Sequence, residues 1–223
     1  MLVGTLINAA TIVIASIAGI LVGSRMKDEV RKALMNVLGL PVLLIGISMG
    51  LKTENVLIPT LSIVAGTIAG ELIGIERWLE NFGVRVERRF GRGKFSEGFV
   101  GATLLYCVGP MAILGPIQEG LTGDISVLLA KSMLDGVASI ALASALGIGV
   151  AFSSVSVLLY QGFFAVLASE LSRVVTESMI NELTATGGLL IMGIGINLLE
   201  LKKLRVGNML PALVIAPLIV YFV

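Results

Sequence analysis

Long stretches without a charged residue alternate with short charged segments along this chain. A membrane-spanning helix needs about 20 mostly apolar residues, and several stretches free of Asp, Glu, Lys and Arg reach or approach that length. The longest apolar region, residues 125–169, is interrupted only by Lys131 and Asp135. As a single helix it would be roughly 68 Å long, more than twice the thickness of the hydrocarbon core. The pattern therefore predicts a turn inside it, which we place at Ser153–Ser154.

The pattern predicts an all-α, polytopic membrane protein with one transmembrane domain over residues 1–223 and about eight spans. The predicted spans are residues 2–23, 33–51, 56–75, 99–118, 126–151, 155–170, 183–199 and 207–223. Residues 76–98 form the one long hydrophilic segment, in which Trp78, Phe82, Val86 and Phe90 recur every four residues among arginines. We interpret it as a cytoplasmic, interfacial, amphipathic helix. A lipid-regulatory or partner-docking segment would have the same composition.

Composition agrees with the membrane interpretation and narrows the chemistry. Of the 223 residues 56 % are apolar, 14 % are charged and 27 are glycine, and the mean hydropathy is +1.00. A soluble or disordered chain would carry more polar residues. The absence of histidine excludes histidine-based catalysis and histidine-ligated metals, and the lone Cys107 excludes an intramolecular disulfide. We expect no cofactor, no metal and no enzymatic activity, since Ser132 and Lys131 point about 100° apart on a helix and make a poor dyad.

The basic residues are concentrated in alternate loops. The odd-numbered loops carry 13 of the 16 lysines and arginines, the even-numbered loops carry two, and Lys131 lies inside a span. Because cytoplasmic loops collect basic residues, this distribution predicts that both termini lie outside the cytoplasmic membrane. It also gives no reason to expect nucleic-acid binding. Gly23 and Ser24 lead directly into Arg25, so we expect span one to be retained and not cleaved as a signal peptide.

Two short segments of the chain resemble each other. Residues 43–51 are similar to residues 190–198, and each is followed by a polar loop and then a leucine-rich span with a proline, Pro59 or Pro211. If spans one to three repeat as spans six to eight around a central four–five pair, the copies have opposite orientations. Such inverted repeats are usual in secondary transporters. A rival alignment pairs span one with span five and would be parallel.

Two charged residues lie deep in predicted span five. A charged side chain near the bilayer centre costs at least about 2.5–3.5 kcal/mol, and Lys131 and Asp135 are four residues apart, so they share a helix face. Small residues continue that face through Ser139 and Ala143, which would let another helix approach closely. In the functional interpretation Asp135 is a coupling carboxylate for a proton or cation and Lys131 is its counter-charge. In the structural interpretation the pair satisfies itself and fixes helix packing.

Other polar residues inside the predicted spans are further candidates for transport or ion binding. They are Ser132, Ser139, Tyr160, Gln161, Asn8, Asn197 and Gln118. A single membrane asparagine more often links helices than binds a ligand. Pro110 and Pro116, each next to a glycine, either break span four and expose its carbonyls to a cavity or kink it. Gly66, Gly70 and Gly74 form a small-residue face that suits helix packing or a homodimer.

The order of the short motifs is similar to that of a known family. These motifs are Gly109-Pro110-Met111, Gln118 to Gly120, Gly123-Asp124, Lys131-Ser132, Asp135-Gly136, Tyr160-Gln161-Gly162, Gly187-Gly188 to Asn197, and Arg205 to Ala212. Together they resemble the YqgA-like (YdfK-like) bacterial membrane proteins, a domain of unknown function, over essentially the whole chain. The resemblance implies a bacterial inner-membrane protein and implies that the Lys131–Asp135 block belongs to the family pattern. This chain departs from that pattern at Pro110 and Pro116, where smaller residues are usual.

These observations favour a small secondary transporter or permeation protein for an ion or small solute, with Lys131 and Asp135 at its site. The alternative is a non-transporting membrane scaffold or partner subunit that docks through residues 76–98. The partners that we expect are the lipid bilayer, the ion or solute, and a second copy bound through glycine-rich helix faces.

Overall fold

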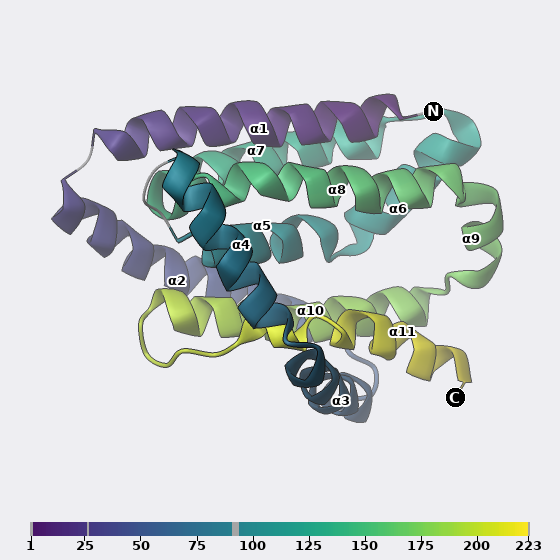
Figure 1. The fold of residues 1–223 in the computed structure, drawn as a ribbon. Coiled ribbons are helices and arrows are strands. Elements are labelled where there is room, and N and C mark those ends of the chain that lie inside the picture. Colours follow the sequence, from purple (N-terminus) through teal and green to yellow (C-terminus); the bar gives the residue numbers. More distant parts are fainter. Residues whose placement is uncertain (1, 26, 91–93, 223) are drawn as a thin grey trace. The chain divides into compact units, whose positions relative to one another are not determined.

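Helices alone form the regular structure of the residues that the computed structural model describes, 2–25, 27–90 and 94–222, which confirms the all-α prediction. The elements in order are α1 (Val3–Ser24), α2 (Asp28–Gly50), α3 (Leu57–Ile73), α4 (Ile75–Phe90), α5 (Phe95–Cys107), α6 (Pro110–Thr122), α7 (Ser126–Leu146), α8 (Gly149–Val166), α9 (Ala168–Val174), α10 (Glu177–Leu198), the 3₁₀ helix η1 (Val206–Met209) and α11 (Ala212–Phe222) (Figure 1).

Each predicted span has a helix at its place, but eight crossings are not confirmed. Among the described residues four helices are long and apolar enough to cross a membrane, namely α1, α7, α8 and α10. The number rises to six if the bent pairs α3–α4 and α5–α6 each form one span. The remaining two predicted spans correspond to apolar helices below that length, Asn36–Gly50 and Val206–Phe222.

The prediction of a turn at Ser153–Ser154 is wrong. Both serines lie inside α8, where their hydroxyls donate to the carbonyls of Val150 and Ala151 at 2.6 and 2.7 Å. The chain turns instead at Gly147, which has φ 81° and ψ −149°. Only glycine adopts this backbone conformation readily. The fifth span therefore ends earlier than residue 151, and the sixth begins earlier than residue 155.

Predicted span four, residues 99–118, is not one continuous helix. It consists of parts of α5 and α6, which meet at Val108–Gly109 with a bend of 57°. Gly109 has φ 144°, and Pro110 supplies the first residue of α6, where its missing N–H leaves no gap in the helix ladder. The prolines were expected either to break span four or to kink it, and at Pro110 the structure shows a break.

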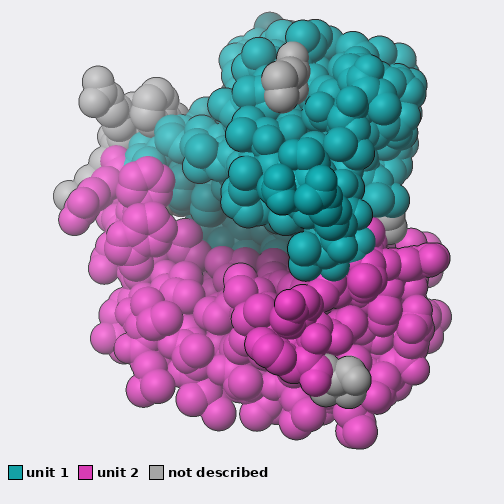
Figure 2. Space-filling model, turned by 90° about the vertical axis from the view of Figure 1, so that its right-hand side faces the viewer, with its two compact units in different colours: residues 1–32, 86–175 teal, residues 33–85, 176–223 magenta. Residues whose placement is uncertain are grey.

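The chain divides into two compact units, which Figure 2 colours separately. Unit 1 comprises Met1–Lys32 and Val86–Val175, and unit 2 comprises Ala33–Arg85 and Thr176–Val223. In unit 1, α1 packs along α7 and α8, and α5 and α6 also pack on α8. In unit 2, α3 packs on α11 and η1, and α10 packs on α11 and α3.

Glycines allow these helices to touch backbone to backbone. In unit 1 a Cβ on Gly19 would lie 2.4 Å from the carbonyl oxygen of Ile140 in α7. In unit 2 a Cβ on Gly70 would lie 2.0 Å from the carbonyl oxygen of Asn208. Gly66 and Gly70 are thus used for packing within the chain, whereas Gly74 has φ 76° and ends α3 as a left-handed cap.

The helices α1 and α3 are equivalent in sequence, a likeness that the sequence analysis did not find. Residues 6–23 and 57–74 are identical at nine of 18 positions. Each N-terminus is held by a buried glutamate. Glu119 accepts from the N–H groups of Gly4 and Thr5 at 2.9 and 3.3 Å, and Glu182 accepts from those of residues 54 and 55 at 2.7 and 3.1 Å. A carboxylate at a helix N-terminus satisfies free donors and complements the helix dipole.

The hydrophilic segment after α3 folds as the amphipathic helix α4. Leu79 and Val86 are buried, while Trp78 is 64 % exposed and stacks on Phe82 with ring centroids 5.8 Å apart. The side chain of Phe90, the fourth member of the predicted face, lies outside the part of the structure that is described. An exposed aromatic pair next to arginines is what an interfacial helix presents to a membrane surface.

Candidate functional site

A buried ion pair lies on α7, as the four-residue spacing predicts. Lys131 Nζ is 2.8 Å from Asp135 Oδ2 and 3.0 Å from Oδ1, and both side chains are 7 % exposed. Opposite charges one helical turn apart can meet without bending the helix. Each charge is therefore neutralised by its neighbour inside an otherwise apolar helix.

Asn8 brings α1 to this pair. Its Nδ2 donates to Asp135 Oδ2 at 3.0 Å, and Asn8 itself is fully buried. A Cβ on Gly136, next to Asp135, would lie 2.9 Å from Thr11 of α1, so the two helices are in close contact here. The amide oxygen of Asn8 has no hydrogen-bond partner within the described structure. Asn8 thus links two helices and also leaves an acceptor free beside the charges.

The broken end of α5 lies beside the same pair. The hydroxyls of Tyr106 and Ser139, one turn beyond Asp135, are 2.8 Å apart. Tyr106 and Cys107 are the last two residues of α5, and both are buried. Sequence analysis missed Tyr106, although its position directly before the Gly-Pro break was a usable signal. The cluster therefore joins α1, α5 and α7.

Gln161 extends the polar groups to α8. It lies on the same face of α8 as Val150 and Ala165. Val150 approaches Gly98 of α5, and Ala165 approaches Gly120 of α6. Gln161 is fully buried, and neither atom of its amide has a partner among the described residues. Because a buried unpaired amide costs free energy, Gln161 is a group with spare capacity to bind a ligand on the face turned toward the broken pair α5–α6.

The other predicted site residues lie apart from this cluster or bond elsewhere. Ser132 donates to the carbonyl of Leu128 at 2.7 Å, and Tyr160 packs its ring on Phe164. Gln118 donates to Asp124 at 2.7 Å near the surface. Asn197 belongs to unit 2, where it exchanges bonds of 2.7 and 2.8 Å with the backbone of Leu204. The residues joined by direct bonds are Asn8, Lys131 and Asp135, with Ser139 and Tyr106 beside them.

The cluster has the chemistry of a binding site for an ion or a small polar solute. It offers one carboxylate, one ammonium, two hydroxyls and the amide of Asn8, and the described residues contain no group of three or more His, Cys, Asp or Glu that could hold a metal. A proton or cation on Asp135 would compete directly with the Lys131 ammonium for the same oxygens. Such competition is one way to couple two binding events.

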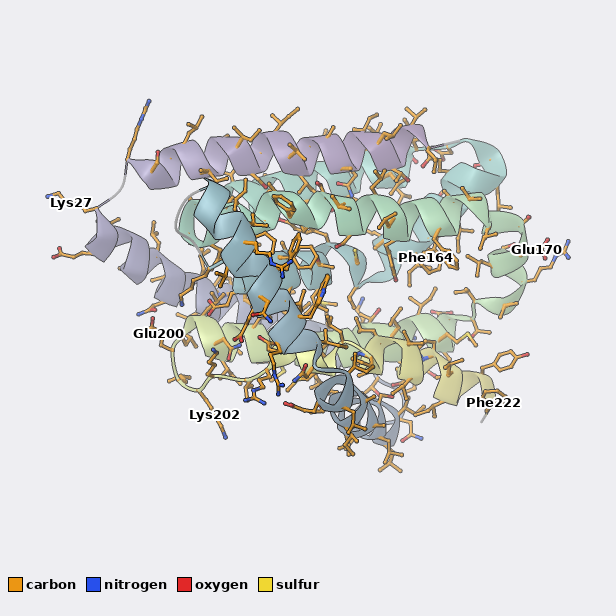
Figure 3. All side chains as sticks on the ribbon, viewed as in Figure 1. Lys27, Phe164, Glu170, Glu200, Lys202 and Phe222 are labelled. Carbon is orange, nitrogen blue, oxygen red and sulfur yellow. The ribbon has the colours of Figure 1, made fainter. Side chains whose placement is uncertain are left out.

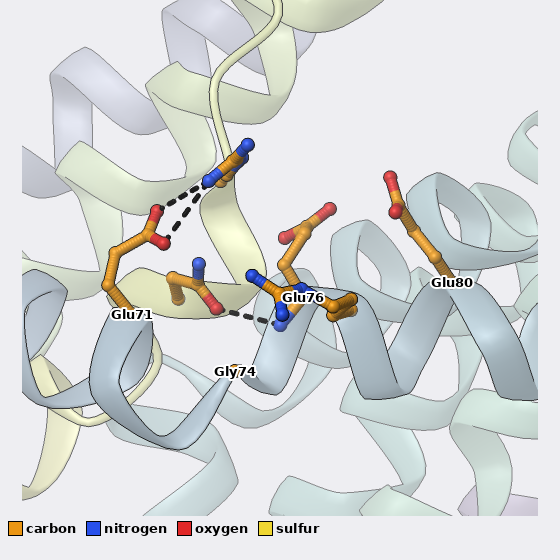
Figure 4. A pocket seen from close by; sticks show the side chains of 7 residues that line it. Glu71, Gly74, Glu76 and Glu80 are labelled. Atoms are coloured by element: carbon orange, nitrogen blue, oxygen red, sulfur yellow. Dashed lines mark hydrogen bonds and ion pairs between the residues drawn. The ribbon is translucent and has the colours of Figure 1, made fainter.

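A second group of charged side chains lies in unit 2, where α3 meets α4 (Figure 4). Arg205 donates to both carboxylate oxygens of Glu71 at 3.2 Å. Asn208 accepts from the N–H of Glu76 at 2.7 Å, and Glu76 accepts from the N–H of Gly207 at 2.7 Å. This reciprocal contact gives the Arg205–Ala212 motif a structural reason, because it fixes η1 against the start of α4. Burial raises the pKa of Glu76.

The fold and the cluster define a class of protein. Exposed apolar faces on several long helices, together with polar groups and charges enclosed between them, are the properties of a multi-pass helical membrane protein. The chain belongs to the family described as "Protein of unknown function (DUF554)", whose sequence profile matches residues 3–221.

Two relatives in that class match nearly the whole chain. The "Uncharacterized membrane protein YdfK" of Bacillus subtilis (strain 168) is 31 % identical over 224 residues, which covers 99 % of this chain and 96 % of the relative. The "Uncharacterized protein YqgA" of Escherichia coli (strain K12) is 31 % identical over 223 residues and covers 97 % and 95 %. No solved structure matches. The resemblance inferred from the motifs is therefore confirmed.

Proposed function

We propose that this protein is a small secondary transporter or permeation protein for an ion or small solute, with its site at the polar cluster of unit 1. The observation that carries the proposal is the buried Lys131–Asp135 pair beside a helix break. Broken helices in membrane transporters expose main-chain groups at the level where substrate binds. Here the break at Val108–Gly109 follows Tyr106 and Cys107 directly, and the Tyr106 hydroxyl is 2.8 Å from that of Ser139, one turn beyond Asp135.

Unit 2 supports a functional interpretation of the pair. Its helix α3 is equivalent to α1 and is held by Glu182 as α1 is held by Glu119, yet Pro59 stands where α1 has Asn8. The ion pairs described in unit 2, Lys203–Glu80 and Arg205–Glu71, are exposed. The described residues of unit 2 therefore show no buried ion pair equivalent to Lys131–Asp135. Since burying charges is costly, retaining the pair in unit 1 favours a role beyond packing.

In the proposed cycle a proton or small cation binds Asp135 and displaces the Lys131 ammonium. Lys131 and Asn8 then lose an acceptor, and the unpaired amides of Asn8 and Gln161 become available to the transported species. Return of Lys131 to Asp135 expels the cation and restores the neutral, closed pair. The pair acts in this proposal as an internal competitor that prevents the site from holding its ion too tightly.

The test is ion-dependent flux in proteoliposomes. The full chain would be reconstituted with an internal pH dye and given a pH gradient in sodium chloride, potassium chloride or sodium acetate, with the membrane potential clamped. We expect faster proton movement than in protein-free vesicles in at least one salt. The double variant Lys131→Met/Asp135→Asn should lower that rate at least tenfold. Removing both charges together avoids a lone buried charge, whose cost would be about 3–5 kcal/mol.

The matched control is Glu170→Gln/Arg173→Gln, which removes an exposed ion pair from the same unit. It should leave the rate unchanged, and thermal unfolding should show that both double variants are folded. The transporter proposal fails if the Lys131/Asp135 variant keeps the full rate, or if the wild-type protein is no faster than empty vesicles in all three salts.

A non-transporting scaffold is the second candidate, and one observation favours it. The Lys131–Asp135 pair is buried and closed on itself, as a purely structural link between α1 and α7 would be. A scaffold predicts no flux with any of the three salts and a stable partner that crosslinks to α4 in native membranes. The flux measurement thus separates the two functions.

A further inference from the structure

The charged pocket of unit 2 is a second site that the proposed transport function does not use. We propose that it binds the headgroup of a zwitterionic phospholipid, with Arg77 as the ligand of the phosphate and the pocket's carboxylates as ligands of a primary ammonium. Its charged lining consists of Glu71, Glu76, Arg77, Glu80 and Arg205 (Figure 4).

The position of the pocket along the chain matches the headgroup level of a bilayer. Directly before it, at the end of the apolar helix α3, Leu72 and Ile73 are 84 % and 72 % exposed. Directly after Arg77 comes the exposed Trp78, stacked on Phe82. Tryptophan is enriched at the membrane–water interface. A charged pocket with exposed apolar side chains on both sides fits an amphipathic ligand, whose headgroup enters the pocket while its acyl chains lie along the apolar side chains.

The hydrogen bonds leave one cation of the pocket free. Arg205 is engaged by Glu71, and Glu80 is paired with Lys203 at 3.2 Å. Within the described part of the chain Arg77 is exposed and forms no ion pair or hydrogen bond. A guanidinium whose N–H groups are not used in hydrogen bonds is well suited to bind a phosphate through two parallel hydrogen bonds. The phosphate of the headgroup is therefore assigned to Arg77.

The carboxylates decide which headgroup fits best. Three glutamates and two arginines line the pocket, and Lys203 pairs with Glu80, so the charges of these side chains balance. A headgroup without net charge keeps that balance, whereas one that carries only negative charge adds an uncompensated charge beside the carboxylates. Phosphoethanolamine offers a phosphate for Arg77 and an ammonium that can donate hydrogen bonds to Glu71 or Glu80. Phosphoglycerol offers only the phosphate. The charge pattern thus favours phosphatidylethanolamine over phosphatidylglycerol.

Native mass spectrometry of the delipidated full chain tests this assignment. Phosphatidylethanolamine, phosphatidylglycerol and inorganic phosphate would be added separately at equal concentration. We expect the highest bound fraction with phosphatidylethanolamine and a loss of at least fivefold in Arg77→Gln. The control Arg173→Gln removes an exposed arginine in unit 1 and should bind as the wild type does. Thermal unfolding would confirm that both variants are folded.

Each other outcome overturns part or all of the proposal. Equal binding by Arg77→Gln and Arg173→Gln would remove Arg77 from the site. Equal or tighter binding of phosphatidylglycerol would overturn the zwitterionic preference. Binding of inorganic phosphate as strongly as the lipid would make the pocket a site for a soluble anion. None of these results bears on flux through unit 1, so the two proposals fail independently.

Discussion

The buried polar residues of this protein are tolerated because nearly every charged oxygen has a donor. Asp135 accepts from Lys131 and Asn8. Glu119 and Glu182 accept from backbone N–H groups at the starts of α1 and α3. A hydrogen bond to a charged group contributes about 1.5–3 kcal/mol, whereas an unsatisfied buried charge costs more than it gains. The neutral amide of Gln161 differs, because neither of its polar atoms has a hydrogen-bond partner among the described residues. Its amide therefore keeps the capacity to form further hydrogen bonds.

Glu76 gives a pH prediction at this scale. Burial raises the pKa of its carboxyl above the usual 4.5, so the folded state keeps the proton to higher pH than the unfolded state. The stability that this group contributes is therefore complete below pH 4.5 and falls as the pH rises through the raised pKa. The variant Glu76→Gln keeps an oxygen for the Gly207 N–H and does not titrate. As the pH rises from about 4.5 to 7, its unfolding midpoint in detergent should therefore increase relative to the wild-type midpoint.

Asp124 provides a control of opposite sign. The backbone N–H of Ser126 lowers the pKa of Asp124 below its usual 3.8, so its contribution is lost only as the pH falls below that value. Above pH 4.5 the unfolding midpoint of Asp124→Asn should thus change with pH as the wild-type midpoint does. Parallel curves for Glu76→Gln and the wild type over that range would contradict the assignment.

At the scale of elements, α1 and α3 show how one helical pattern is used twice. Both begin at a buried glutamate from another helix, and both accept a partner's backbone at the equivalent glycines, Gly19 and Gly70. The residues that differ decide what each helix does, because Asn8 reaches a charge while Pro59 at the equivalent place cannot. Glycine contacts are therefore common to both units, and the polar link belongs to unit 1.

Substituting these glycines tests their role in packing. Gly19→Ala and Gly70→Ala would place a Cβ 2.4 and 2.0 Å from a partner's carbonyl oxygen, and the helices would have to separate. We expect each to lower stability by about 1–3 kcal/mol. In Gly162→Ala the new Cβ meets nothing within 4 Å, so that variant should be neutral or slightly more stable. Unfolding can be followed by the fluorescence of Trp78, the single tryptophan. Equal midpoints for all three variants would exclude close packing at Gly19 and Gly70.

At the scale of the whole molecule, several charged residues lie in the segments that connect helices. Lys27 lies between α1 and α2, and Glu200 and Lys202 lie between α10 and η1, with their side chains directed away from the ribbon (Figure 3). The charge rule predicts that these two segments, which belong to odd-numbered loops, are cytoplasmic. The number of crossings depends on α2 and on η1–α11, whose apolar lengths are below that of a standard span.

Cysteine labelling decides these crossings. In a Cys107→Ser background, single cysteines would replace Lys27, Lys52, Lys202 and Phe222, all exposed. With eight spans and both termini outside, an impermeant maleimide added to intact cells should label positions 52 and 222 but not 27 and 202 until the cells are opened. Labelling of 27 and 52 from the same side would show that α2 does not cross. Labelling of positions 202 and 222 from the same side would show that η1–α11 does not cross the membrane.

The sequence by itself determined the class of this protein, its helices and its principal pair of charges. Apolar length and charge spacing are local properties, so a helix lies at the place of each predicted span and Lys131 meets Asp135 within one turn. The turn at Gly147 and the break at Val108–Gly109 depend on backbone conformations that composition alone does not locate.

Tertiary structure decided which distant residues meet. It brought Asn8 and Tyr106 to α7, left Gln118 and Asn197 elsewhere, and placed Glu119 and Glu182 at the starts of α1 and α3. Each of these contacts joins side chains to groups on another element, and its energy depends on helix packing across long chain separations. The hydrophobic periodicity of the sequence does not show which residues far apart along the chain come into contact.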